Sequence, residues 1–113
     1  METFTLVIGT TPINLWLLLT AQATYAGASV QGSRRMSTPN APLCNELIIL
    51  ADDANTDTVY GGNTSAVATT DYGYRILTSQ DYTLKSNGVP NVPLTQWLVG
   101  GAATQKIHVK ITW

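Results

Sequence analysis

The stretch that decides the fold is the final one, Gln105-Lys106-Ile107-His108-Val109-Lys110-Ile111-Thr112. Its apolar residues stand at every second position, and charged, imidazole or hydroxyl side chains stand between them. A period of two is typical of a β-strand with one face on a core and the other toward solvent. We therefore expect a strand that points Ile107, Val109 and Ile111 inward, with Gln105 at its edge.

The same period recurs upstream, and Gly, Pro, Asn and Asp residues separate the repeats. Further strands are expected at residues 4–8, 23–31, 43–51, 58–60, 74–77, 82–84 and 96–99, with a loosely strand-like segment at 63–70. Residues 32–42 are expected to form a loop, because their Arg, Ser, Pro and Asn residues suit a ladder poorly. The sequence thus predicts an all-β protein of about seven to nine short strands, a single antiparallel β-sandwich or jelly roll.

Residues 13–20 have two interpretations. Their nearly continuous apolar run suits a strand that is buried on both faces, and it equally suits two turns of helix. We predict a strand, because threonines flank the run and no helix stop signal follows it. The length of 113 residues predicts one domain, residues 1–113. Residues 1–22 are expected to serve as an N-terminal arm or as an extra strand for assembly contacts.

Composition argues against several classes of partner. Charged residues make up 12% of the chain and the net charge is −1, so no basic field is present to attract a phosphate backbone, and we expect no nucleic-acid partner. The longest apolar run, residues 15–19, is too short to span a bilayer. It is also preceded by Glu2 rather than by Lys or Arg, unlike a signal peptide. We expect a soluble protein without a membrane partner.

Few residues are suited to chemistry. One cysteine, Cys44, and one histidine, His108, make a disulfide or a zinc cluster impossible within one chain, and we expect a buried, inert thiol. The spacing Asp53-x-Asn55-x-Asp57 resembles the start of a calcium loop, but Thr58 stands where such a loop needs glycine, so we prefer a plain turn. For His108 a surface or interface role is expected. We predict no catalytic residue, no metal and no cofactor.

The aromatic and arginine residues supply the candidates for contact with a partner. Trp97 lies in an expected strand and is assigned to the core. For Trp16 and Trp113 an interface anchor, a core position and a sugar-stacking platform all stay open. Arg34 and Arg35 lie in the longest expected loop, where either solvent or a partner is their neighbour. The set that we predict at a partner interface consists of Phe4, Trp16, Arg34, Arg35, Met36 and Trp113.

Residues 47–113 carry a family resemblance. The pattern consists of an apolar strand Leu47-Ile48-Ile49-Leu50-Ala51-Asp52, then Asn55-Thr56-Asp57-Thr58-Val59-Tyr60-Gly61-Gly62, then Tyr74-Arg75-Ile76-Leu77 and Tyr82-Thr83-Leu84, and finally residues 96–111 around Gly100-Gly101. It resembles small β-sandwich proteins of phage virions. We expect the glycine pairs to supply backbone angles that other residues resist. Such domains serve as head decorations, neck parts, or fibre and tail modules.

The resemblance implies a structural role. We expect a capsid cement or decoration protein that binds the major capsid protein on the virion surface as a homotrimer. The alternative is a tail, neck or fibre module that contacts a host glycan or other tail proteins. An enzyme is not expected. Exposed strands at residues 4–8 and 107–111 are predicted to pair across subunits.

Overall fold

The computed structural model describes residues 2–20, 36–37 and 41–112, and within them the chain forms strands and one short helix. This confirms the all-β class. The elements are β1 (Glu2–Ile8), β2 (Ile13–Asn14), α1 (Leu15–Thr20), β3 (Met36–Ser37), β4 (Ala41–Cys44), β5 (Glu46–Ala51), β6 (Val59–Gly62), β7 (Tyr74–Ile76), β8 (Asp81–Lys85), β9 (Val92–Pro93), β10 (Trp97–Gly100) and β11 (Gln105–Thr112).

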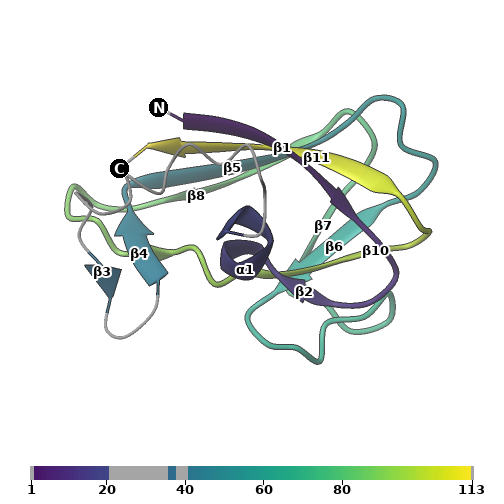
Figure 1. Ribbon diagram of the computed structural model, residues 1–113, viewed down its shortest axis with the longest axis horizontal. Helices are drawn as coiled ribbons and strands as arrows, with labels where there is room; N and C mark the ends of the chain where they lie inside the picture. Colours follow the sequence, from purple (N-terminus) through teal and green to yellow (C-terminus); the bar gives the residue numbers. More distant parts are fainter. Residues whose placement is uncertain (1, 21–35, 38–40, 113) are drawn as a thin grey trace.

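Eight of these strands form two four-stranded antiparallel sheets, in the orders β1-β11-β5-β8 and β2-β10-β6-β7. In Figure 1 the first sheet runs across the top of the view and the second lies below it on the right. The first of the eight strands pairs with the last, the second with the seventh, the third with the sixth and the fourth with the fifth. This is the wiring of a jelly roll, a long hairpin rolled into a two-sheet sandwich. The remaining strands, β3, β4 and β9, form a small separate sheet.

The core lies between the two sheets, and strand alternation determines which residues enter it. Along β11 buried residues alternate with more exposed ones, and Ile107, Val109 and Ile111 are fully buried, which confirms the predicted inward face. Strand β5 shows the same alternation. Because β11 lies between β1 and β5, the expectation that residues 107–111 form an exposed strand for pairing across subunits is wrong.

The predicted strand at residues 13–20 is also wrong, because α1 occupies Leu15–Thr20. Asn14 causes the change. Its Oδ1 accepts hydrogen bonds from the backbone N–H groups of Trp16 (2.9 Å) and Leu17 (3.3 Å), which is how an N-cap residue starts a helix. Leu15 and Leu19, one helical turn apart, are fully buried. The continuous apolar run therefore reflects a helix that packs one face into the sandwich.

Three further predictions about strands need correction. Residues 63–70 were expected to be loosely strand-like, but they form bends and turns with one isolated bridge from Ala68 to Asp71. Residues 32–42 were expected to be a loop, but β3 and the start of β4 lie within them and pair with each other. Residues 43–51 were expected to be one strand, but the ladder breaks at Asn45, whose backbone N–H donates to Thr112 and whose carbonyl accepts from Ser86. The break lets β4 leave the large sheet and pair with β9.

Backbone angles are not what the glycine pairs supply, and one glycine of each pair has a different role. None of Gly61, Gly62, Gly100 and Gly101 has a positive φ. A Cβ on Gly61 would instead lie 2.2 Å from the ring of Tyr74, its cross-strand neighbour in β7. A Cβ on Gly101 would meet the Asp57 carboxylate at 2.6 Å. These glycines therefore provide room for close side chains rather than unusual backbone angles.

Candidate functional site

The most organised group of polar side chains on the sheet surface joins Thr5, His108 and Asp52. Thr5 of β1 lies directly opposite His108 of β11, and its Oγ1 is 3.0 Å from the His108 Nδ1. The other ring nitrogen, Nε2, is 2.7 Å from Oδ1 of Asp52, which follows the last residue of β5. One imidazole therefore connects strand β1, strand β11 and the turn after β5.

The hydrogen-bond partners determine which ring nitrogen carries a proton. An ionised carboxylate only accepts, so Nε2 of His108 donates to Asp52. Nδ1 then accepts from the Thr5 hydroxyl when the ring is neutral, and it donates to the same oxygen when the ring is charged. The imidazole therefore has a hydrogen-bond partner at each ring nitrogen, and the group links β1 to the turn after β5.

Asp52 is held in its ionised form. The hydrogen bond from His108 lowers the pKa of this carboxyl from its ordinary value of 3.8, and a second bond from the Ala54 backbone N–H to Oδ2 acts in the same direction. The carboxylate borders a shallow hollow of about 310 Å³, which is lined by Leu50, Ala51, Asp52, Asp53, Ser79 and His108.

The turn between β5 and β6 uses its polar residues to hold the neighbouring chain. The Asn55 amide donates to the Lys106 carbonyl (2.8 Å) and its Oδ1 accepts from the Lys106 N–H (2.7 Å), so the side chain takes the place of a strand residue. The Asp57 carboxylate accepts from the Thr58 N–H. Buried Gln105 accepts from the Asp57 N–H. These residues serve the turn, as the preferred interpretation predicts.

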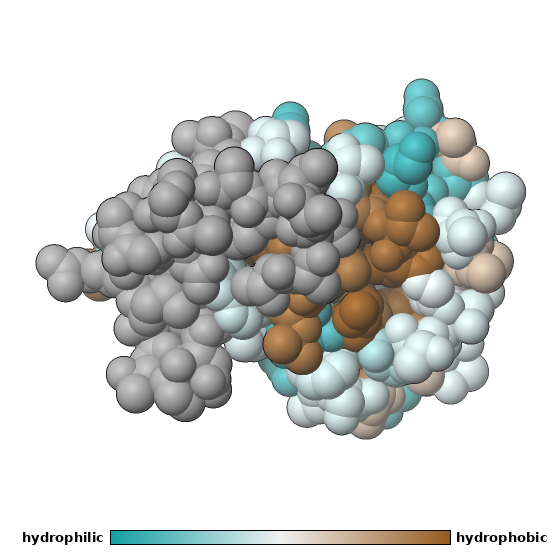
Figure 2. Space-filling model, in the orientation of Figure 1, coloured by the Kyte–Doolittle hydropathy of each residue, from teal (hydrophilic) through white to brown (hydrophobic). Residues whose placement is uncertain are grey.

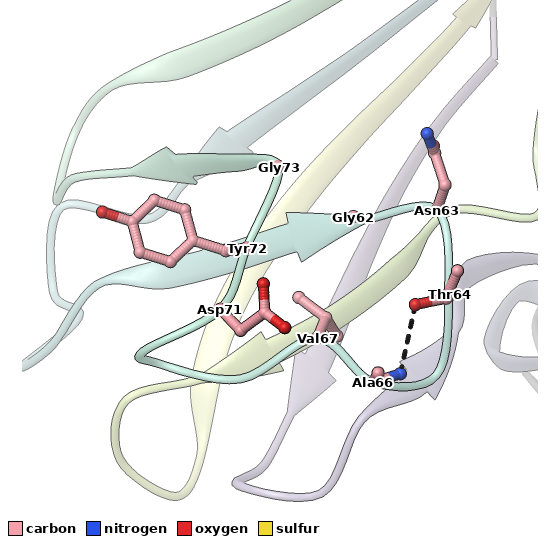
Figure 3. A pocket seen from close by; sticks show the side chains of 8 residues that line it. All are labelled: Gly62, Asn63, Thr64, Ala66, Val67, Asp71, Tyr72 and Gly73. Carbon is pink, nitrogen blue, oxygen red and sulfur yellow. Dashed lines mark hydrogen bonds between the residues drawn. The ribbon is translucent and has the colours of Figure 1, made fainter.

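A second hollow lies between the end of β6 and the start of β7, with a volume of about 250 Å³. Its wall is held by paired backbone hydrogen bonds between Ala68 and Asp71. Figure 3 shows the Asp71 carboxylate pointing into the loop toward Val67, whereas the Tyr72 ring points the other way. That ring packs beside Tyr60, with centroids 5.0 Å apart. The Asp71 carboxylate therefore lines this hollow together with the polar side chains of Asn63 and Thr64.

Of the six residues predicted at a partner interface, the structure describes the side-chain surroundings of Phe4 and Trp16, and the predicted interface itself stays a prediction. Trp16 is 6% exposed and belongs to the core cluster, which favours the core position over the interface and sugar-stacking alternatives. Phe4 is partly buried against the same core from β1. Met36 lies in β3, on the small sheet. Arg34, Arg35 and Trp113 lie outside the described residues, as does the expected strand at 23–31.

Two expectations about core residues have different outcomes. Cys44 is fully buried, as predicted, and burial raises the pKa of its thiol to about 11, which keeps it protonated and unreactive. Trp97 was assigned to the core, but it is only half-buried, at the start of β10.

Apolar side chains reach the surface where the end of β1 approaches α1. Val7 of β1 is 52% exposed and Leu17 of α1 is 61% exposed. Figure 2 shows apolar atoms gathered on this face, around the position of α1 and β2. Scattered exposed apolar residues are normal in a soluble chain, but neighbouring ones mark candidate contact surfaces.

Sequence reasoning missed the carboxylate partner of His108. Asp52 and His108 are 56 positions apart in the chain, and no local spacing joins them. No pairing of the strand at residues 43–51 with the last strand was predicted. Only that strand order places Asp52, which directly follows the first of these strands, beside His108.

Comparisons with known proteins identify no relative. No family model, no curated protein and no solved structure matches this chain. Among the described residues, no helix has the length and apolarity that a membrane crossing requires.

Proposed function

We propose that this protein is a structural component of a phage virion, a cement or decoration subunit that binds the major capsid protein on the shell as a homo-oligomer. The observation that carries the proposal is the jelly-roll wiring of the two sheets. Jelly rolls recur in viral capsid proteins and in lectins. This support is an analogy at the level of the fold, and it agrees with the motif resemblance in residues 47–113.

The surface composition supports the same role. Charged side chains are sparse, and the outer face of β1 offers Thr3, Thr5 and Val7, all of which are exposed. Removing neutral side chains from water against a shell costs less free energy than removing unpaired charges does. Several weak contacts joined in one oligomer act at high effective concentration. The homotrimer expected from the sequence stays a prediction within this proposal.

The decisive experiment uses purified particles with and without this protein. Stripped particles are heated beside complete ones, and the temperature of genome release is measured for both. We expect stripped shells to open at a lower temperature and readdition of the protein to restore the original value. Equal release temperatures would contradict the cement role. Copy number adds a second measurement, because a decoration subunit is expected in hundreds per particle and a neck or tail part in about a dozen.

A binding module of the tail, neck or fibre is the second candidate. The hollow in Figure 3 favours it, because the Asp71 carboxylate points into a loop wall that is held by backbone hydrogen bonds. Carboxylates accept hydrogen bonds from hydroxyl groups such as those of a glycan. A glycan array probed with the protein and with Asp71→Ala tests this function. Binding that the substitution abolishes would favour it, and no binding by the unsubstituted protein would remove it.

A further inference from the structure

Strand β1 forms one edge of the sheet β1-β11-β5-β8. Its seven residues pair with β11 without interruption, from Glu2 opposite Ile111 to Ile8 opposite Gln105. Among the strands that the structure describes, β11 is the only neighbour of β1. Within the described residues, one side of β1 therefore has a straight row of backbone groups that no other strand pairs.

The residues of a strand direct their backbone groups alternately toward one neighbour and the other, and this alternation identifies the outward groups of β1. The Asp52 N–H donates to the Lys106 carbonyl, so the even-numbered residues of β11 direct their backbone toward β5. The odd-numbered residues of β11 must then bond β1, and their partners there are even-numbered. The N–H and C=O groups of Thr3, Thr5 and Val7 consequently face the open side. Within the described residues no hydrogen bond of theirs on that side is present.

Natural sheets protect such edges with lysines, prolines, bulges or very short strands. Apart from its first residue, Glu2, β1 contains no charged residue and no proline, and the continuous register excludes a bulge. The other three edges are protected: β8 begins with Asp81 and ends with Lys85, β7 has three residues with exposed Arg75 at its centre, and β2 has two residues. The open edge of β1 is thus an exception within the same molecule.

We propose that β1 pairs antiparallel with β1 of a second copy of this chain, in a register centred on Thr5. In that register Thr5 lies opposite its own copy, and Thr3 lies opposite Val7 of the second copy. All outward N–H and C=O groups of these three residues then gain partners, because an antiparallel pair exchanges both bonds at alternate positions. The two four-stranded sheets become one continuous sheet across a two-fold axis.

The side chains fit this register. On the outer face the opposed residues are threonines and a valine, β-branched residues that pair well across strands, and no like charges meet. A β8 strand paired with β8 of a second copy would also bring opposite charges together. The charged ends of β8 are hydrated when the strand is unpaired, and this hydration opposes such a pair. This pairing does not depend on the virion role. It predicts a dimer where the sequence predicts a homotrimer, and the mass of the unsubstituted protein distinguishes the two.

Two proline substitutions test the contact on the full chain. The Ala51 N–H donates to the Gln80 carbonyl, so by the same ladder rule the Thr83 N–H points away from β5, as the Thr5 N–H points away from β11. Proline is tolerated at such outward edge positions, and it removes the donor. Molar mass is measured by light scattering over a range of concentrations. We expect dimers for the unsubstituted protein and for Thr83→Pro, and at least about tenfold weaker dimerisation for Thr5→Pro.

A second pair of variants guards against a folding defect in Thr5→Pro. Val7→Lys puts a charge on the open edge while leaving Thr5 and His108 intact, and Val89→Lys is the matched control in an exposed loop. We expect monomers for the first and dimers for the second, with unchanged circular dichroism. Three results would overturn the proposed pairing. The unsubstituted protein could be a monomer, its dimer could survive Val7→Lys, or it could be a trimer that both Thr5→Pro and Thr83→Pro dissociate. A dimer that fails to bind particles would uphold it and contradict the virion role instead.

Discussion

The two edges of the sheet β1-β11-β5-β8 differ although both strands alternate in the same way. At the β8 edge, Tyr82 stacks on Tyr74 of β7 with ring centroids 4.0 Å apart and planes 4° apart, which joins the two sheets. The Tyr74 hydroxyl in turn donates to buried Gln96. Burial raises the pKa of Tyr74, so this hydroxyl stays protonated and keeps donating. Strand β8 also has a charge at each end.

At the β1 edge the attachment is different. Leu6 and Ile8 are almost fully buried, and Thr5 is linked to His108, but the outward backbone groups have no partner within the described residues. The comparison teaches that the two edges of one sheet can differ in their side chains: β8 has a charge at each end, whereas β1 has none after Glu2 and is the edge that we propose to pair with a second copy. Residue choice makes the difference, because the backbone geometry of the two edges is alike.

The largest expected effect distinguishes how deeply each edge strand is anchored. Leu6 is 1% exposed in β1, whereas Leu84 in β8 is only partly buried. Leu6→Ala is expected to lower the free energy of unfolding by about 2–5 kcal/mol, through lost burial and a cavity. Leu84→Ala is expected to cost about 1–2 kcal/mol. Urea denaturation measures both, and equal losses would show that the two edges are anchored alike.

The next effect concerns the aromatic closure of the β8 edge. Tyr82→Ala removes the ring that stacks on Tyr74, and we expect a loss of about 2–3 kcal/mol of unfolding free energy. Tyr82→Phe keeps the ring and is the control, with an expected change below about 1 kcal/mol. A similar loss in both variants would assign the effect to the Tyr82 hydroxyl and not to stacking.

A smaller effect, with a defined pH dependence, concerns the link from β1 to Asp52. The folded-state pKa of Asp52 is lowered from 3.8, so its contribution to stability is complete above the unfolded pKa and is lost as pH falls through the folded pKa. The melting temperature of Asp52→Asn is expected to lie below that of the unsubstituted protein at pH 7. In strong acid the two melting temperatures are expected to converge. A melting-temperature difference that stays constant from pH 7 to pH 2 would contradict this role.

The smallest effect is expected at the charged end of β8. Lys85 Nζ lies 4.0 Å from Glu46 Oε2, and the lysine side chain is 74% exposed. Lys85→Ala is expected to change the free energy of unfolding by less than about 0.5 kcal/mol, because solvent screens such pairs. Thermal melts at low and high salt measure the change. A loss above 1 kcal/mol would mean that this charge stabilises the fold rather than only blocking the edge.

Much of the fold was readable from particular residues. The alternation in Gln105–Thr112 predicted the buried face of β11, and Cys44 was correctly placed in the core. The helix α1 was missed because an apolar run does not distinguish a helix from a doubly buried strand, and the N-cap function of Asn14 depends on geometry. Gly61 and Gly101 were misread because their cause, the Tyr74 ring or the Asp57 carboxylate packed against the backbone, comes from distant segments.

The amino-acid sequence alone determined the all-β class, since side-chain direction in a strand follows from a local period of two. It also determined the neutral character of the surface, which composition sets directly. Only the tertiary structure decided which strands are edges, which N–H groups point outward, and that Asp52 meets His108 across the sheet. Those properties depend on strand order and ladder phase, which arise from pairing between segments far apart in the chain and leave no trace in local spacing.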